Sequence, residues 1–320
     1  MSISIIGTGK IVAEVLEMLR QERLGVRVDA IFAHRNLERA HRLAEEYGIA
    51  RVYTDYPMLL EETTSDFIYI ANVNDQHYPY ALQALQRDRN VIIEKPICLK
   101  TSELDELIDV ARMKGLFLFE AMTFRHMPNY KALRDDVAKI GRIRLVEANF
   151  SQYSSRYDQY RAGVVMPVFD PAHAGGALLD LGIYNISLVT ALFGPPDEAC
   201  YYPNRGFNGV DTSGTMVMRY ADFVAVCSAA KDAYGESHFT IEGEKGYIRI
   251  RGAVGEFREY ELYVHGEATV VVNRQAGTHR LSHEFIRFIE IYAQRDTRRM
   301  NELLEQARTA IGVCYGLHGA

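Results

Sequence analysis

The stretch Ser2-Ile-Ser-Ile-Ile-Gly7-Thr-Gly9-Lys-Ile-Val12 decides how the N-terminal part of the chain folds. It predicts a strand over Ser2–Ile6, after which apolar residues recur at helical spacing as far as Gly25. Glycines at such a strand–helix junction let backbone amides approach a pyrophosphate at the positive end of the helix. Val12 occupies the third position of the glycine fingerprint, so the turn alone is only a weak sign of a dinucleotide site.

Strands and helices alternate as far as about residue 120. The further strands that we expect are Val26–Ala33, Arg51–Tyr53, Phe67–Ala71, Val91–Glu94 and Leu116–Glu120. The helices between them are Leu37–Tyr47, Pro57–Glu62, Gln76–Arg87 and Ser102–Met113. This alternation predicts an α/β fold with a doubly wound parallel sheet, whose ligands bind at the carboxyl ends of the strands.

The pattern changes after Pro128. A helix is expected at Asn129–Lys139, and helical patterns recur at Ala177–Phe193 and from Leu281 to the end. The strand-like runs are Arg142–Gln152, Thr212–Tyr220, Phe223–Ala229, Ser237–Glu242, Tyr247–Arg251 and Tyr260–Val264, joined by short turns. We therefore predict two domains: a Rossmann domain over residues 1–120, and an α+β domain with a large, mostly antiparallel sheet over residues 121–320.

Composition excludes several classes of protein. The 320 residues include 36 Lys+Arg and 42 Asp+Glu, a formal net charge of -6, and the basic residues are scattered, which argues against a nucleic-acid partner. Cys98, Cys200, Cys227 and Cys314 are widely separated, so neither a zinc site nor a disulfide framework is expected. We find no signal peptide and no apolar stretch approaching the about 20 residues that span a bilayer, and we expect a cytoplasmic protein without a membrane partner.

The end of the second strand bears on the choice of dinucleotide. NAD-binding sheets of this kind place an acidic residue there to accept the ribose hydroxyls, whereas this chain reads Ile31-Phe-Ala-His34-Arg35. Asp29 lies at the wrong end of the strand. A guanidinium at Arg35 with His34 beside it suits a 2′-phosphate, which favours NADP(H) over NAD(H). The alternative is that Arg35 is a solvated loop residue.

Two more strand ends point to the same edge of the sheet. One continues as Ala71-Asn72-Val-Asn74 and reaches His77, and the other as Glu94-Lys95-Pro96. The lysine of the second segment is aimed at the cofactor ribose and the substrate, or else forms a surface ion pair that contributes little. His77 either lines the nicotinamide side or is a structural histidine with its hydrogen bonds satisfied.

A third segment, Gly175-Gly176…Asp180…Tyr184, lies in the second half of the chain. Asp180 and Tyr184 are four residues apart on a predicted helix, so they share one face. The glycine pair favours close approach of another group to the backbone. On pattern alone, a polar pair at this spacing is more often an ordinary surface or capping feature.

Together these segments resemble the Gfo/Idh/MocA family of oxidoreductases in order and spacing, over essentially the whole chain. The Glu94-Lys95-Pro96 tripeptide is the most specific element, Val73 replaces a usual proline, and Tyr184 is typical of the glucose–fructose oxidoreductase and dimeric dihydrodiol dehydrogenase branches. The resemblance implies a cis peptide before Pro96 and an open sheet that serves as the interface of a homodimer or larger homo-oligomer. It implies cofactor contacts from Gly7, Thr8, Gly9, Lys10, Ile11, His34, Arg35, Ala71, Asn72, Asn74, His77, Glu94, Lys95 and Arg125, without a metal.

The resemblance also implies hydride transfer between a nicotinamide and a hydroxyl-bearing carbon of a sugar, polyol or cyclic dihydrodiol. Tyr184 is the expected acid/base, Lys95 its electrostatic activator, and Asp180 the orienter of Lys95 or of the substrate. A phenol with a pKa of about 10 is a poor base at neutral pH. A lysine ammonium at about 4 Å, in an effective dielectric of about 20, would favour phenolate by about 4 kcal/mol.

Two other functions stay open at this stage: a dinucleotide-binding regulator without catalysis, and an NAD-dependent glycoside hydrolase. The residues Tyr153, Arg156, Tyr157, Tyr160 and Arg161 are hydrogen-bond donors for a hydroxylated substrate or else members of a solvated loop. His126, His173, His238 and His283 show no ligand spacing, and we interpret them as structural.

Overall fold

The computed structural model describes residues 1–275 and 277–315. The chain divides into two compact units. The first unit consists of Met1–Ala121 and Leu281–Glu305, and the second unit of Met122–Arg280 together with the residues from Gln306 onward.

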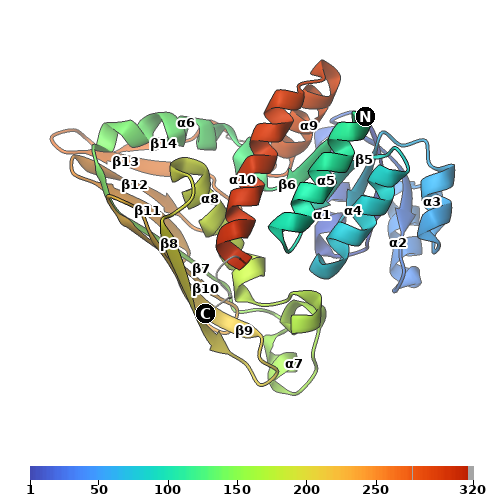
Figure 1. Ribbon diagram of the computed structural model, residues 1–320, viewed down its shortest axis with the longest axis horizontal. Coiled ribbons are helices and arrows are strands. Elements are labelled where there is room, and N and C mark those ends of the chain that lie inside the picture. The colour runs from blue at the N-terminus through green and yellow to red at the C-terminus, as the bar shows by residue number, and fades with distance from the viewer. Residues whose placement is uncertain (276, 316–320) are drawn as a thin grey trace. The chain divides into compact units, whose positions relative to one another are not determined.

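The first unit contains a six-stranded, wholly parallel sheet in the order β3-β2-β1-β4-β5-β6, of which Figure 1 labels β5 and β6. Its strands are β1 (Ser2–Ile6), β2 (Arg27–Phe32), β3 (Arg51–Tyr53), β4 (Phe67–Ile70), β5 (Asn90–Glu94) and β6 (Leu118–Ala121). The helices between them are α1 (Lys10–Glu22), α2 (Leu37–Tyr47), α3 (Tyr56–Glu62), α4 (His77–Gln86) and α5 (Thr101–Lys114). Every predicted element lies within two residues of its expected bounds, and strand order reverses between β1 and β4, where such sheets bind ligands.

Two C-terminal helices correct the predicted domain division. The helical pattern from Leu281 forms α9 (Ser282–Gln294) and α10 (Thr297–Tyr315), and Leu281–Glu305 belongs to the first unit rather than the second. The Phe285 ring lies 6.0 Å from that of Tyr69, and the Tyr292 ring 4.9 Å from that of Phe67. An amphipathic pattern predicts that a helix buries one face but not which sheet covers it, so the assignment to residues 121–320 is wrong for this stretch.

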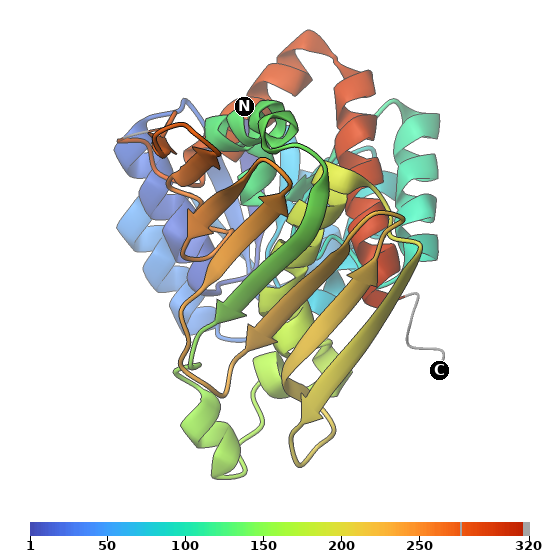
Figure 2. The same cartoon turned by 90° about the vertical axis from the view of Figure 1, so that its left-hand side faces the viewer.

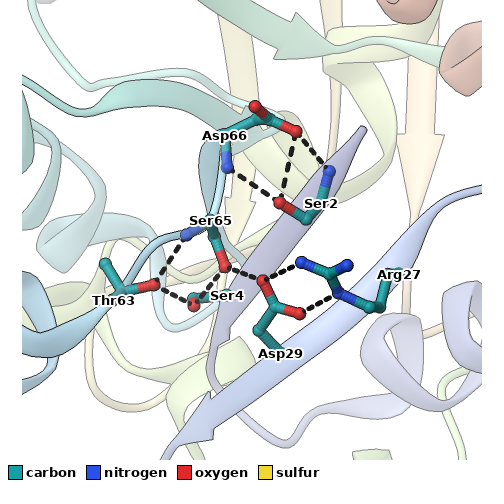
Figure 3. A network of polar contacts seen from close by, with 7 residues as sticks. All are labelled: Ser2, Ser4, Arg27, Asp29, Thr63, Ser65 and Asp66. Carbon is teal, nitrogen blue, oxygen red and sulfur yellow. Dashed lines mark hydrogen bonds and ion pairs between the residues drawn. The ribbon is translucent and has the colours of Figure 1, made fainter.

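A polar network joins the amino ends of β1 and β2 to the segment before β4 (Figure 3). The Asp29 carboxylate accepts from Arg27 Nε at 2.5 Å and from Ser65 Oγ at 2.8 Å. Burial acts to raise the pKa of Asp29, but these hydrogen bonds outweigh it and hold the pKa below its usual value. Asp29 is thus engaged at the edge of the sheet opposite to the glycine turn.

The second unit is built on an eight-stranded sheet in the order β14-β13-β12-β11-β7-β10-β9-β8 (Figure 2). Its strands are β7 (Ile143–Ser151), β8 (Glu198–Arg205), β9 (Asp211–Arg219), β10 (Val224–Ala230), β11 (His238–Gly243), β12 (Gly246–Arg251), β13 (Tyr260–Val264) and β14 (Val270–Val272). All pairs are antiparallel except β7 with β10. The two edge strands, β8 and β14, were not predicted, because an edge strand buries little and β8 has no fully buried residue.

The helix expected over Ala177–Phe193 consists of a π-helical turn, Leu178–Gly182, followed by α8 (Ile183–Phe193). An 18-residue window within Pro171–Phe193 has a mean hydropathy of 1.6, and this helical segment is long enough to cross a membrane, so the expectation that no apolar stretch approaches that length is wrong here. Its most apolar window is 72% buried, which is typical of a core helix. Among the residues that the structure describes, no helix covers the sheet face turned toward the viewer in Figure 2.

Candidate active site

The glycine turn lies where the carboxyl ends of β1 and β4 meet. Gly7 has a φ of +117°, and a Cβ there would lie 2.5 Å from the carbonyl oxygen of Ala71, so no larger residue fits. Gly9 is the N-cap of α1 and no side chain caps the helix, which leaves its first-turn amides available to a ligand. Thr8 completes the turn between the two glycines, and Lys10 and Ile11 begin α1, Lys10 being exposed.

The chain leaving β4 adds an unsatisfied polar atom to this edge. Ala71 N donates to Ile6 O at 2.8 Å, which continues the β1–β4 pairing by one residue. Asn72 Oδ1 is buried and has no hydrogen-bond partner among the described residues. Buried amide oxygens are rarely left unpaired, and a donor from a bound ligand would satisfy this one. Asn74 begins the 3₁₀ turn Asn74–Gln76 that leads into α4. This edge therefore fits a dinucleotide.

The chain between β2 and α2 carries exposed basic side chains. His34 and Arg35 follow β2 and are both exposed. In the first turn of α2, Arg39 Nη2 lies 3.5 Å from Gly9 O, so its guanidinium is beside the glycine turn. Arg39 was not predicted as a site residue, although its place three residues after the N-cap Asn36 was a usable signal.

The Glu94-Lys95-Pro96 segment follows β5. The peptide between Lys95 and Pro96 is cis, which confirms the expectation. The Glu94 carboxylate is buried and accepts from Tyr69 Oη at 2.5 Å and from the backbone amide of Lys95 at 3.3 Å. Glu94 thereby ties the lysine turn to β4. Tyr69 was not predicted, because it lies inside a strand whose pattern is apolar.

His77 and Glu120 hold the other side of the same turn. His77 is 1% exposed, and its Nδ1 lies 2.7 Å from the carbonyl oxygen of Pro96, a distance that fits donation. Its Nε2 lies 3.4 Å from the carbonyl oxygen of Asn72, and burial lowers the pKa of His77 to about 4. Glu120 Oε1 accepts from Ile97 N at 3.1 Å. These contacts favour the structural role for His77, while a contact with the nicotinamide stays a prediction.

In the second unit, the carboxylate of Asp180 is held by a lysine that sequence reasoning missed. Asp180 Oδ2 lies 2.7 Å from Lys231 Nζ, across 51 residues of sequence. Asp180 lies in the π turn and Lys231 directly follows β10. No local pattern links these two positions, so only the packing of the π turn on β10 brings them together.

The glycine pair lets the start of this helix approach other backbone. A Cβ at Gly175 would lie 2.4 Å from Pro167 O, and one at Gly176, where φ is +130°, would lie 1.9 Å from Asp211 Oδ1. Asp211 Oδ2 in turn accepts from Leu178 N at 2.7 Å, at the beginning of the π turn. The predicted close approach is thus made by other parts of the chain, and it positions the helix that carries Asp180 and Tyr184.

The ring of Tyr184 has two neighbours that fix its place. Its centroid lies 5.9 Å from that of Phe150, and a Cβ at Gly255 would lie 3.2 Å from Tyr184 Cε1. Phe150 also packs against the buried cluster formed by Ala177, Leu181 and Ala229. The loop that contains Gly255 was not predicted to approach the tyrosine, because the two are far apart in sequence.

Arg125 is buried in the 3₁₀ turn Thr123–His126 of the second unit. Its guanidinium carbon lies 5.9 Å from the ring centroid of Phe124. Its assignment as a cofactor contact stays a prediction.

The segment from Tyr153 to Arg161 includes the short helix α7 (Tyr157–Arg161). Tyr160 is a core residue: it is buried, its ring stacks on Phe169 at 4.8 Å, and its hydroxyl donates to Asn208 Oδ1 at 2.7 Å. Tyr153 donates to Asp158 at 2.7 Å. Tyr160 is therefore not available to a substrate, whereas the rest of the segment is partly or fully exposed.

Within residues 1–275 and 277–315, no cluster of three or more His, Cys, Asp or Glu side chains has the arrangement of a metal site.

Comparison with known proteins identifies the family to which the chain belongs. Residues 1–122 match the model of an oxidoreductase family with an NAD-binding Rossmann fold, and residues 131–249 match the GFO/IDH/MocA C-terminal domain. The chain is 30% identical over 321 aligned positions to scyllo-inositol 2-dehydrogenase (NADP(+)) of Bacillus subtilis, which covers 98% of this chain and 97% of that protein. The chain belongs to the Gfo/Idh/MocA family. This Gfo/Idh/MocA protein is therefore an enzyme, an oxidoreductase.

Two further relatives of this Gfo/Idh/MocA oxidoreductase extend the comparison. It is 27% identical over 304 positions to trans-1,2-dihydrobenzene-1,2-diol dehydrogenase of Mus musculus, covering 88% of each chain. Its fold matches that of a 3-ketoreductase from Actinomadura kijaniata solved with NADP and TDP-benzene, with a TM-score of 0.85, 22% identity and coverage of 99% and 98%. The resemblance stated from the sequence motifs is confirmed.

Proposed function

We propose that this oxidoreductase transfers a hydride reversibly between NADP(H) and a hydroxyl-bearing carbon of a sugar, polyol or cyclic dihydrodiol. The observation that carries the proposal is that a Gfo/Idh/MocA chain contains Lys95, Asp180 and Tyr184 together. The relatives named for scyllo-inositol and for a dihydrodiol support this range of alcohols. A regulator without catalysis would have no need of all three side chains.

The glycine-turn edge of the first unit would hold the dinucleotide. The amides at the start of α1 would bind the pyrophosphate, and Asn72 Oδ1 would accept a hydrogen bond from the cofactor. Arg35 and Arg39 would pair with the 2′-phosphate, which is the reason for preferring NADP(H). When bound, the nicotinamide supplies the hydride donor or acceptor.

The protein's own side chains would then handle one proton and the orientation of the substrate. Tyr184 would exchange the proton with the reacting oxygen. Lys95, whose backbone is fixed through Glu94 and Pro96, would donate a hydrogen bond to that oxygen and stabilise negative charge on it. Asp180 would accept a hydrogen bond from a substrate hydroxyl.

The first test is a titration with NADPH and with NADH. Binding is measured by the fluorescence of the dinucleotide itself, because the chain has no tryptophan whose fluorescence could report it. NADPH should bind about tenfold more tightly or better, a difference of about 1.4 kcal/mol. Arg35→Ala and Arg39→Ala should reduce this preference. The matched control is Arg42→Ala, which removes an exposed cation from the same helix. Equal binding of the two dinucleotides would refute the phosphate role of these arginines.

The second test is turnover of scyllo-inositol, D-glucose, D-xylose and trans-1,2-dihydrobenzene-1,2-diol with NADP⁺, measured by the absorbance of the reduced cofactor. Reduction of NADP⁺ with at least one of them supports the proposal. Tight NADPH binding without turnover of any alcohol or of the corresponding ketones would instead indicate a regulator. Cleavage of a glycoside without release of reduced cofactor would indicate a hydrolase.

We also propose that the enzyme works in the cytoplasm as a homo-oligomer that pairs through the open face of its sheet. Cys98, Cys200 and Cys227 are free thiols, which suits a reducing compartment. Tyr202, Val224 and Val271 are exposed apolar side chains on strands of this sheet. Size-exclusion chromatography with light scattering tests the assembly, and a monomer at all concentrations would refute it.

A further inference from the structure

Lys231, at the end of β10, is a buried cation with all of its donors in use. Its side chain is 3% exposed, whereas that of its partner Asp180 is 39% exposed. The ammonium lies 2.7 Å from Asp180 Oδ2 and 2.9 Å from Val168 O, and 4.7 Å from the ring centroid of Phe169. An ammonium has three N–H donors, and the two oxygens and the ring face account for them. Lys231 therefore has no donor left for a substrate.

The backbone around Lys231 is fixed as well. Its amide donates to Thr212 O at 2.8 Å, and its carbonyl accepts from Ser154 N at 2.9 Å. The same carbonyl oxygen of Val168 that accepts from Lys231 Nζ also accepts from Gly176 N at 3.1 Å. The ammonium thus connects the end of β10, the turn before the glycine pair and the π turn that carries Asp180.

The two side chains of the ion pair differ in their exposure to solvent. The lysine side is closed to water, while the aspartate side chain remains partly open. A buried ion pair is a poor source of stability, because desolvation of the two charges offsets their attraction. A role in the reaction explains better why a charged lysine occupies this buried position.

We propose that Lys231 is a positioning residue for substrate binding: it holds Asp180 as an ionised carboxylate in a fixed orientation, ready to accept a hydrogen bond from a substrate hydroxyl. This proposal rests on the proposed function, which makes the substrate an alcohol. Lys231 acts only through Asp180, and does not touch the substrate or the dinucleotide.

A double-mutant cycle tests this dependence. Lys231→Met removes the charge but keeps a flexible side chain of similar length. With the best substrate of the panel, kcat/KM should fall about tenfold or more, mostly through KM, because the carboxylate loses its orientation. In the Asp180→Asn background, the same Lys231→Met change should alter kcat/KM by less than about twofold. An equal loss in both backgrounds would overturn the proposal.

Three readouts separate positioning from a merely structural role. The acid limb of the pH–kcat/KM profile should move to higher pH in Lys231→Met, because Asp180 without its cation protonates more readily. The carboxyl carbon resonance of Asp180, identified by its absence from Asp180→Asn, should likewise titrate at higher pH in Lys231→Met. NADPH affinity should stay within about twofold of the parent, since a positioning role for Asp180 does not involve the dinucleotide.

Controls keep each outcome decisive. Lys139→Met breaks an ion pair of the same 2.7 Å length, in which an exposed lysine contacts the buried carboxylate of Asp136, and should leave kcat/KM and the pH profile unchanged. If Lys231→Met does not fold, Asp180→Asn is compared with the doubly substituted protein, which buries no unpaired charge, and a further loss in the double variant overturns the proposal. An unmoved Asp180 resonance overturns it even if no alcohol of the panel reacts. Inactivity of the parent enzyme on the whole panel bears on the proposed function alone.

Discussion

Substituting His77 with asparagine should change how the stability of the first unit depends on pH. The His77 ring is 1% exposed, and its Nδ1 contacts Pro96 O at 2.7 Å. An asparagine amide nitrogen can occupy nearly the place of Nδ1 and donate the same hydrogen bond, but it does not titrate. His77→Asn therefore removes the titration and keeps the donor.

The magnitude follows from the depressed pKa. Burial lowers the pKa of His77 from 6.5 to about 4, so the fold binds the neutral ring and protonation opposes folding. Because the pKa of His77 is lower in the folded than in the unfolded protein, its contribution to stability is fully present above the unfolded-state pKa of 6.5. That contribution is lost as the pH falls from 6.5 toward 4. With these two values, the loss from His77 is about 2 kcal/mol at pH 5 and about 3 kcal/mol at the acid limit.

Urea unfolding followed by far-ultraviolet circular dichroism at pH 7.5 and pH 5 measures this loss. The parent protein should lose about 2 kcal/mol more than His77→Asn between the two conditions, whatever the other titrating groups contribute to both. The control is His41→Asn, at an exposed position of α2, which should behave as the parent. Equal pH dependence of the parent and His77→Asn would refute the reasoning, as would a His77 ring that titrates near 6.5 by nuclear magnetic resonance.

Lys95→Met should lower turnover of the best alcohol more than about tenfold and leave NADPH binding within about twofold, because the lost ammonium acts on the reacting oxygen; a smaller loss of turnover contradicts its role. Gly7→Ala should lower both NADPH affinity and Tm, because φ is +117° and the new Cβ would lie 2.5 Å from Ala71 O. Gly25→Ala is its control: φ is +71° but no atom lies within 4 Å of the added Cβ, so the cost should be only the about 1–2 kcal/mol of a left-handed alanine. Thermal melts and NADPH titrations of both glycine variants check this, and similar behaviour of the two would contradict the close-approach argument.

Local patterns were enough for the first unit's sheet. The alternation of short β-branched runs with stretches of helical spacing predicted all six parallel strands within two residues of their bounds. The Gly7–Gly9 turn and the Glu94-Lys95-Pro96 segment were recognisable because each is a short run of adjacent residues. The cis peptide at Pro96 came from the family resemblance rather than from the pattern itself.

Contacts between distant residues were not predictable in this way. Tyr69 and Glu120 read as ordinary strand residues, yet their side chains hold Glu94 and Ile97 on either side of the lysine turn. Lys231 follows an apolar strand and carries no motif. A hydrogen bond between two secondary-structure elements does not alter the hydrophobic periodicity of either segment, so the sequence pattern cannot predict it.

The sequence by itself determined the fold class, the glycine turn and the family, because these depend on residues that are neighbours along the chain. Only the tertiary structure decided that α9 packs on the first sheet, that His77 is buried between two carbonyl oxygens, and that Asp180 is paired with Lys231. The physical reason is that burial and pairing depend on which surfaces come together. Many surfaces satisfy the same hydrophobic pattern, and the choice among them is made by packing over the whole unit.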